Sequence, residues 1–193
     1  WRPARAAAEG YLRRVRYQVA ASLDGYIADP EGGYDWIVAE PEIDFGELNA
    51  QFDTLLMGRR SYLELRTEFE RSGAYAEKEI LVFSSTLEPG EIPHRVVRPE
   101  ETDRVVAELR SRPGGDIWLY GGGELFRSLL ERGHVDTVEP AVIPVLLGRG
   151  RPFLPESDGS WSLRLARQRV YQGSGIVLLE YEVAGPLERA KNE

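Results

Sequence analysis

The stretch Asp116-Ile-Trp-Leu-Tyr-Gly-Gly-Gly-Glu-Leu-Phe126 does most to decide the fold of this chain. Residues 117–120 are apolar, aromatic or β-branched, which predicts a buried strand. The three glycines that follow let the backbone turn sharply and leave no Cβ in the way of a ligand. Leucine and phenylalanine side chains at helical spacing come next, so the segment predicts a strand, a glycine turn and a helix.

This order of elements has two interpretations. Where a helix begins after a glycine turn, unpaired N–H groups and the positive end of the helix dipole point at one spot, an arrangement that binds phosphates. The segment could equally be a tight connection between a strand and a helix with no ligand. Taken by itself it supports the two interpretations equally.

The composition excludes several classes of function. Hydrophobic residues make up 42% and charged residues 29% of the 193 residues, as is usual for a globular domain. The chain has no Cys, and its two histidines, His94 and His134, are too far apart to predict a zinc site. A net charge of −8 argues against general affinity for nucleic acid. We therefore expect neither a metal nor a nucleic-acid partner.

The chain also shows no membrane or export signal. No apolar stretch approaches the roughly 20 residues that cross a bilayer, and no signal-peptide core precedes the first strand. We expect a cytoplasmic protein with no membrane partner. We divide the chain into a basic N-terminal arm over residues 1–15, peripheral to function, a single domain over 16–185 and a polar tail over 186–193.

Strand-like and helix-like segments alternate along this domain. Strands are predicted over residues 17–21, 54–57, 80–83, 96–97, 117–120 and 137–143, and helices over 45–52, 62–69, 102–109 and after the glycines. Such alternation predicts an α/β fold with a mostly parallel sheet and helices on both faces. Residues 162–172 and 176–183, joined by Gly173-Ser-Gly, predict an antiparallel C-terminal hairpin at the sheet edge.

Groups suited to phosphates follow three of the predicted strands. Ligands of an open α/β sheet bind at the carboxyl ends of its strands, and these ends carry Gly58-Arg59-Arg60-Ser61, Ser84-Ser85 and Gly121-Gly122-Gly123-Glu124. Arginine offers permanently charged, bidentate contacts, which Ser and backbone N–H groups complement. Each group alone is more simply a solvated face, a turn or a cap. Their occurrence together favours a phosphorylated dinucleotide.

Acidic residues after the first strand are candidates for the substrate side. Asp24 could orient a substrate or only cap the turn. In the acidic loop that follows, Asp35 adjoins Trp36, an aromatic side chain that could pack on a flat heterocycle and exclude water from the carboxylate. Asp35 and Asp44 are our candidates for the group that delivers a proton, although a general acid must also lie within hydrogen-bond reach of its acceptor.

Five motifs together resemble a known family. In order and spacing they are similar to the dihydrofolate reductase superfamily, and more closely to the reductase domain of the deaminase-reductases of riboflavin biosynthesis. The motifs are Ala20-Ala-Ser-Leu-Asp-Gly-Tyr-Ile-Ala28, Leu56-Met-Gly-Arg-Arg-Ser-Tyr62, Leu81-Val-Phe-Ser-Ser85, Leu119-Tyr-Gly-Gly-Gly-Glu124 and Pro144-Val-Leu-Leu-Gly-Arg-Gly150. The resemblance implies a three-layer α/β/α fold of dihydrofolate reductase type, NADPH as cofactor and a homodimer.

The resemblance also implies roles for individual residues. The adenosine 2′-phosphate would be held by Arg59, Arg60 and Ser84, and the pyrophosphate by Ser61 and the amides of residues 121–125, which end at Leu125. The nicotinamide would lie near Ala20, Ile27 and Ala28. The substrate side would be lined by Asp24, Asp35 and Trp36. Gly148 and Gly150 would let the loop after the sixth strand close over the site.

The implied activity is hydride transfer from NADPH to a pyrimidine- or ribosylamine-type substrate such as 5-amino-6-(5-phosphoribosylamino)uracil. Arg149 or Arg151 would serve a substrate phosphate. The chain departs from both branches of the superfamily: Glu42 and Asp44 are only approximate counterparts of the dihydrofolate reductase carboxylate, and residues 62–67 replace the Asp-Asp-Pro stretch of the riboflavin reductases. Two alternatives stay open, a dihydrofolate or pterin reductase and a non-catalytic NADP-binding or sensing module.

Overall fold

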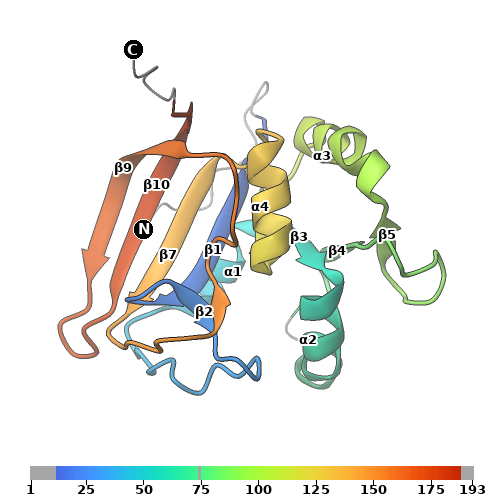
Figure 1. Cartoon of the computed structure of the whole chain (residues 1–193). Helices are drawn as coiled ribbons and strands as arrows, with labels where there is room; N and C mark the ends of the chain where they lie inside the picture. Colours follow the sequence, from blue (N-terminus) through green and yellow to red (C-terminus); the bar gives the residue numbers. More distant parts are fainter. Residues whose placement is uncertain (1–11, 74, 188–193) are drawn as a thin grey trace, which may run out of the picture.

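An eight-stranded sheet with the strand order β5-β4-β3-β6-β1-β7-β10-β9 forms the centre of the molecule (Figure 1). The computed structural model describes residues 12–73 and 75–187. Six neighbouring strands of the sheet run parallel, and β10 and β9 are antiparallel to β7 and to each other. The strands are β1 (Val15–Ser22), β3 (Phe52–Gly58), β4 (Glu79–Phe83), β5 (Arg95–Val97), β6 (Asp116–Gly121), β7 (Thr137–Ile143), β9 (Trp161–Val170) and β10 (Val177–Pro186).

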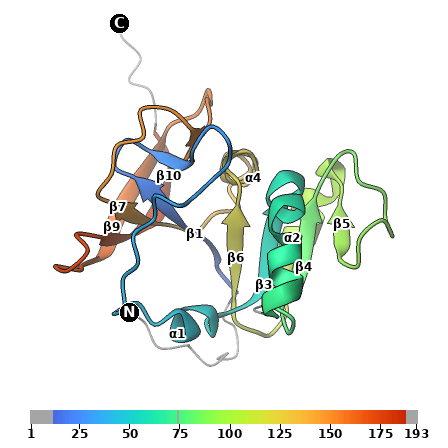
Figure 2. The same cartoon turned by 90° about the horizontal axis from the view of Figure 1, so that it is seen from below.

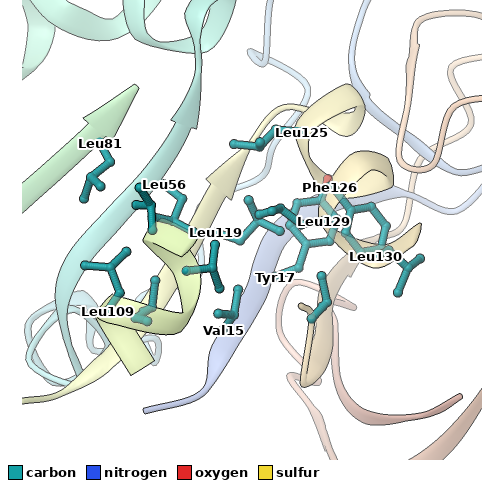
Figure 3. Packing of buried hydrophobic residues seen from close by; sticks show 14 of the residues in the cluster. Val15, Tyr17, Leu56, Leu81, Leu109, Leu119, Leu125, Phe126, Leu129 and Leu130 are labelled. Atoms are coloured by element: carbon teal, nitrogen blue, oxygen red, sulfur yellow. The ribbon is translucent and has the colours of Figure 1, made fainter. Parts of the chain in front are cut away.

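Two helices cover one face of this sheet. They are α3 (Thr102–Ser111) and α4 (Gly123–Glu131). Apolar side chains recur along α4 at the spacing of one helical face, and they pack on apolar side chains of β1, β3 and β6 (Figure 3). At the centre of this contact the rings of Tyr17 and Phe126 stack with their centroids 3.9 Å apart.

The opposite face carries α2 (Arg59–Ser72), which runs alongside β3 and β4 (Figure 2). Its apolar side chains pack with a second buried cluster that includes Leu55, Met57 and Trp118. A third cluster lies near the end of β7, where Ile143, Tyr171 and Ile176 are buried together. The short helix α1 (Phe45–Asn49) and the 3₁₀ helix Pro99–Glu101 complete the helices of the described residues.

A second, two-stranded sheet joins distant loops. It consists of β2 (Tyr26–Ala28) and β8 (Arg151–Pro152), which pair antiparallel. This pairing brings the turn after β1 to the loop after β7, so both lie at the carboxyl end of the parallel strands. The small sheet therefore stands beside the edge at which a ligand of such a fold is expected.

A buried ion-pair network fixes β1 against its neighbours at the opposite end. The Arg16 guanidinium donates to both carboxylate oxygens of Glu139, at 2.7 Å each, and to Gln51 Oε1 at 2.8 Å. Arg16 and Glu139 expose only 4% and 5% of their surface. Burial of a charge is costly unless it is paired and hydrogen-bonded, and here both conditions are met.

The expected architecture, a mostly parallel α/β sheet with an antiparallel C-terminal hairpin, is confirmed, although some boundaries move. The helix after β3 begins at Arg59, before the predicted residue 62, and α1 ends at Asn49, before the predicted residue 52. Residues 1–11 of the predicted arm and 188–193 of the predicted tail lie outside the described residues. Arg13, near the end of that arm, is buried and donates to Thr54 Oγ1 at 2.7 Å. None of the helices in the described part of the chain is long and apolar enough to span a bilayer.

Candidate functional site

The glycine turns after β3 and β6 lie side by side. Met57 pairs with Gly121 in the sheet, and the Gly121–Gly122 peptide bond is cis. A Cβ placed on Gly58 would lie 3.7 Å from Gly121 O and from Gly122 N. Ser61 Oγ would lie 3.2 Å from a Cβ on Gly122. The structure thus brings together two groups that the sequence singled out separately.

Two helices begin at this place without a side-chain cap. Gly58 is the N-cap residue of α2 and Gly122 that of α4, and neither helix receives a hydrogen bond from a capping side chain. The first N–H groups of a helix have no partner within the helix, and they carry the positive end of its dipole. Two uncapped helix starts beside each other suit a ligand with more than one phosphate.

Arg59 and Arg60 add cationic groups to this place. Both side chains are exposed, and neither forms an ion pair with any residue of 12–73 or 75–187. The first turn of α2 contains no acidic residue. By contrast, Arg98 pairs with Glu88 at 2.7 Å. The two guanidinium groups at the start of α2 are therefore available to an anion.

The serines after β4 have different surroundings. Ser84 is buried, and its Oγ accepts hydrogen bonds from the N–H groups of Thr86 at 3.1 Å and Leu87 at 3.0 Å. This oxygen therefore closes the turn after β4. Ser85 is exposed. Because Gly58 pairs with Phe83, both serines follow a strand end next to the arginine turn.

The residues that follow Gly122 also differ in exposure. Glu124 is exposed and pairs with Arg127 at 2.7 Å, whereas Leu125 is buried in the core. Gly123 has no room for a side chain, since a Cβ there would lie 2.7 Å from Pro152 O and 3.0 Å from Pro155 Cδ. The segment around β8 is thus packed directly against the start of α4.

The residues predicted to flank the nicotinamide and the substrate also come together. Ala20, at the end of β1, and Trp36 both pack against the cluster of Ile143, Tyr171 and Ile176. The Trp36 indole N–H donates to Gly33 O at 3.3 Å. Ala28 is buried within β2. The loop that carries Trp36 therefore covers the same part of the sheet as Ala20.

The three predicted acidic residues have separate environments. Asp24 accepts hydrogen bonds from the Ser22 hydroxyl and from two backbone N–H groups, and these bonds lower the pKa of its carboxyl. Asp44 caps α1, where its Oδ1 accepts from the Glu47 N–H at 2.9 Å. Asp35 is exposed and makes no hydrogen bond with the described residues. Of the three, only Asp35 has a carboxylate that is not already bound to the backbone.

Two side chains near this region were missed by sequence reasoning. Gln18 lies two residues before Ala20, on the same face of β1, and its Oε1 is buried without a hydrogen-bond partner among the described residues. Tyr120, directly before the glycines, shares a hydrogen bond with Tyr75, and burial raises the pKa of its hydroxyl. The alternation along β1 and β6 could have identified both, because it places them on the Ala20 face.

The described residues include no group of three or more His, Asp or Glu side chains arranged to hold a metal ion.

The chain is similar to known proteins over most of its length. Residues 13–178 match the family model described as the RibD C-terminal domain. The chain is 31% identical over 184 residues to the uncharacterized protein YyaP of Bacillus subtilis (strain 168), covering 90% of this chain and 96% of that protein.

Solved structures show the same fold. A putative riboflavin biosynthesis protein from Shewanella sp. PV-4 is 26% identical, with a TM-score of 0.73, and the match covers 88% of this chain and 98% of that one. A dihydrofolate reductase from Enterococcus faecalis, complexed with NADP(H), is 19% identical, with a TM-score of 0.59, and covers 92% of this chain and 99% of that one. The predicted dihydrofolate-reductase-like α/β fold is thereby confirmed.

Proposed function

Because this chain belongs to the RibD C-terminal domain family, we propose that it is an NADPH-dependent reductase acting on a pyrimidine- or ribosylamine-type substrate. The observation that carries the proposal is the position of Arg59 and Arg60, which form no ion pair with the described residues, beside two uncapped helix starts. The putative riboflavin biosynthesis protein from Shewanella sp. PV-4, which has the same fold, supports the substrate class. The complex of a dihydrofolate reductase with NADP(H) on this fold supports the cofactor.

The residues present fit a phosphorylated dinucleotide. Guanidinium groups bind phosphate in a bidentate manner, so Arg59 and Arg60 would hold the 2′-phosphate that distinguishes NADPH from NADH. Ser61 and the first N–H groups of α2 and α4 would hold the pyrophosphate. Ser84 would contribute indirectly. Its oxygen already accepts hydrogen bonds from two backbone N–H groups, so it would fix the turn after β4.

When bound, NADPH would supply the hydride, and the protein would supply orientation and electrostatics. Ala20 and the backbone of Ala28 would border the nicotinamide, and Trp36 would cover the substrate ring. Asp35 is our candidate for delivering the proton, either directly or through water. Unlike those of Asp24 and Asp44, its carboxylate accepts no hydrogen bond from the backbone of the described residues. Asp44 is a weaker candidate, since capping α1 already occupies its Oδ1.

Arg149 is the better candidate for an anionic group on the substrate. Arg151 forms a bidentate pair with Glu64, with N–O distances of 2.7 and 2.9 Å, which neutralises its charge. Arg149 is exposed between two glycines and forms no ion pair with the part of the chain that the structure describes. Of these two arginines, Arg149 is therefore the one whose guanidinium remains open to a substrate phosphate.

The proposal includes a homodimer in the cytoplasm. β9 is an edge strand of the main sheet, and it exposes the apolar side chains of Leu163, Leu165 and Val170. An exposed apolar edge favours pairing with a second chain.

The test is a calorimetric titration with NADPH and with NADH. We expect micromolar affinity for NADPH and much weaker binding of NADH. The double variant Arg59→Ala/Arg60→Ala should lose about 100-fold in NADPH affinity, from the loss of two charge-assisted contacts, with little effect on NADH. Arg66→Ala is the matched control, because Arg66 is also an exposed arginine of α2 with no ion pair among the described residues.

Two outcomes would count against the proposal. If neither nucleotide binds the wild-type protein, the turns are structural and the cofactor assignment is wrong. If Arg66→Ala weakens binding as much as the double variant, the effect is one of net charge rather than of the site. NADPH binding without oxidation in the presence of pyrimidine, ribosylamine or pterin substrates would favour the non-catalytic binding module, and oxidation with dihydrofolate alone would favour the pterin reductase.

A further inference from the structure

The turn after β1 and the loop after β7 are joined along their length. The Leu23 N–H donates to Val145 O at 2.9 Å, and the Phe153 N–H donates to Gly25 O at 2.8 Å. Next to the second of these bonds, β2 pairs with β8. The two segments, residues 22–28 and 145–153, are far apart in sequence but behave as one double loop at the carboxyl end of the sheet.

Asp24 makes the central connection of this double loop. Its Oδ1 accepts from the Ser22 hydroxyl at 2.6 Å and from the Leu147 N–H at 3.1 Å. Its Oδ2 accepts from the Gly148 N–H at 2.6 Å. These bonds use both carboxylate oxygens. They also supply partners for N–H groups of the loop at the point where it turns toward Arg149.

The loop held in this way contacts several parts of the proposed site. Gly150 packs so closely on Ala28 O that it has no room for a Cβ. Arg151 pairs with Glu64 of α2, and Pro152 O lies against Gly123 at the start of α4. The loop thus spans from the predicted nicotinamide side to both helices of the phosphate-binding region.

We propose that Asp24 is a positioning residue, which holds the turn at residues 148–150 in place across the site. This role replaces the substrate contact predicted for Asp24 and rests on the proposed function. Through Gly148, Asp24 would fix where Arg149 stands relative to the substrate and where the β8 segment stands relative to the cofactor. A small displacement of groups that orient reactants is enough to slow a reaction strongly.

The experiment compares Asp24→Ala and Asp24→Asn with Asp29→Ala. Asp29 is the matched control, because it directly follows the segment 22–28 and its carboxylate accepts from the Gly33 N–H of its own turn, at 2.6 Å, but from no backbone N–H of residues 145–153. Asparagine keeps the size of the side chain but replaces one acceptor oxygen by a donor, so it should break one of the two loop contacts. Thermal melts would show that each variant is folded.

Three measurements are made on each variant. They are hydrogen exchange of the peptide covering residues 143–153, calorimetric titration with NADPH, and steady-state kinetics with NADPH and 5-amino-6-(5-phosphoribosylamino)uracil. For Asp24→Ala we expect exchange at both Leu147 and Gly148 to be at least about tenfold faster, and for Asp24→Asn we expect this at one of the two amides. We expect kcat to fall about tenfold or more, while the Kd for NADPH changes less than about threefold, because Arg59 and Arg60 are untouched. Asp29→Ala should leave all three quantities near their wild-type values.

Unchanged exchange at these two amides would overturn the inference, because Asp24 would then not hold the loop. Faster exchange with an unchanged kcat would overturn it as well, because the loop would then have no positioning role. Wild-type protein that binds no NADPH is a different outcome. It would refute the proposed function, and the role of Asp24 in turnover with it, whereas the exchange data would still report whether the carboxylate holds the loop.

Discussion

Gly58→Ala is a substitution that separates ligand contact from protein stability. Gly58 has φ −72° and ψ 153°, which alanine adopts without strain. The nearest atoms to the new Cβ would be Gly121 O and Gly122 N at 3.7 Å and Leu125 Cβ at 3.8 Å, all ordinary van der Waals contacts. We therefore expect the free energy of unfolding to change by less than about 1 kcal/mol. Any change should be an increase, because alanine reduces the conformational entropy of the unfolded chain.

NADPH affinity should respond quite differently. The methyl group would stand at the start of α2, where the proposal has a phosphate approach the backbone N–H groups. Moving the phosphate off these groups should weaken NADPH binding at least about tenfold, which is about 1.4 kcal/mol. Calorimetry would measure the affinity, and urea titration would measure the stability of the same preparation.

Gly123→Ala is the matched comparison. There the Cβ would lie 2.7 Å from the backbone oxygen of Pro152, so the chain itself must move. We expect this variant to lose about 1–3 kcal/mol of stability, as overpacked sites do, as well as affinity. If Gly58→Ala binds NADPH like the wild type, the ligand does not pass close to this turn. A close approach of the phosphate to Gly58 would then be refuted, whatever the role of the arginines.

Two further predictions concern stability. Arg16→Met should lower the free energy of unfolding, measured by urea titration, by about 3–5 kcal/mol, because it leaves the Glu139 carboxylate buried without the Arg16 guanidinium. The double variant Arg16→Met/Glu139→Leu should recover most of this loss. Equal losses in both variants would show that the loss comes from packing and not from the buried charge. Ser174→Ala should reduce acid sensitivity. The Ser174 hydroxyl and the Glu42 N–H donate to the Glu40 carboxylate and lower its pKa in the folded protein. The ionised Glu40 therefore stabilises the fold above about pH 4.5, and this contribution is lost as the pH falls through the lower folded-state pKa. Stability curves of wild type and variant that stay parallel down to about pH 3 would contradict this.

The fold was predictable because its signals are local. Apolar alternation, the glycine turn and the helical spacing of residues 123–131 each depend on neighbours in sequence, and the structure has strands and helices at all of these places. The strand β8 was not predicted, since two residues carry no periodicity. It exists because Gly150 and Pro152 fit against β2 and α4, contacts that only the tertiary structure provides.

The candidate site was predictable in its residue types but not in their partners. Asp24 and Asp44 are both acids in loops, yet one binds a loop more than a hundred residues away and the other caps its own helix. Likewise, Arg149 and Arg151 are alike in sequence, and only the position of Glu64 distinguishes them. A pairing between distant side chains leaves no mark in the spacing of either, so the sequence could propose candidates without ranking them.

The position of Arg59 and Arg60 is informative because it is locally unfavourable. Cations at a helix N-terminus oppose the helix dipole. Arg66 is also unpaired among the described residues, but it lies further along α2, where the dipole acts weakly. Arg98 and Arg151 each pair with a nearby glutamate, whereas the first turn of α2 has no acidic residue to pair with Arg59 and Arg60. Such a departure from local stability is expected where a ligand supplies the missing negative charge, as we propose for the phosphate of NADPH at this turn.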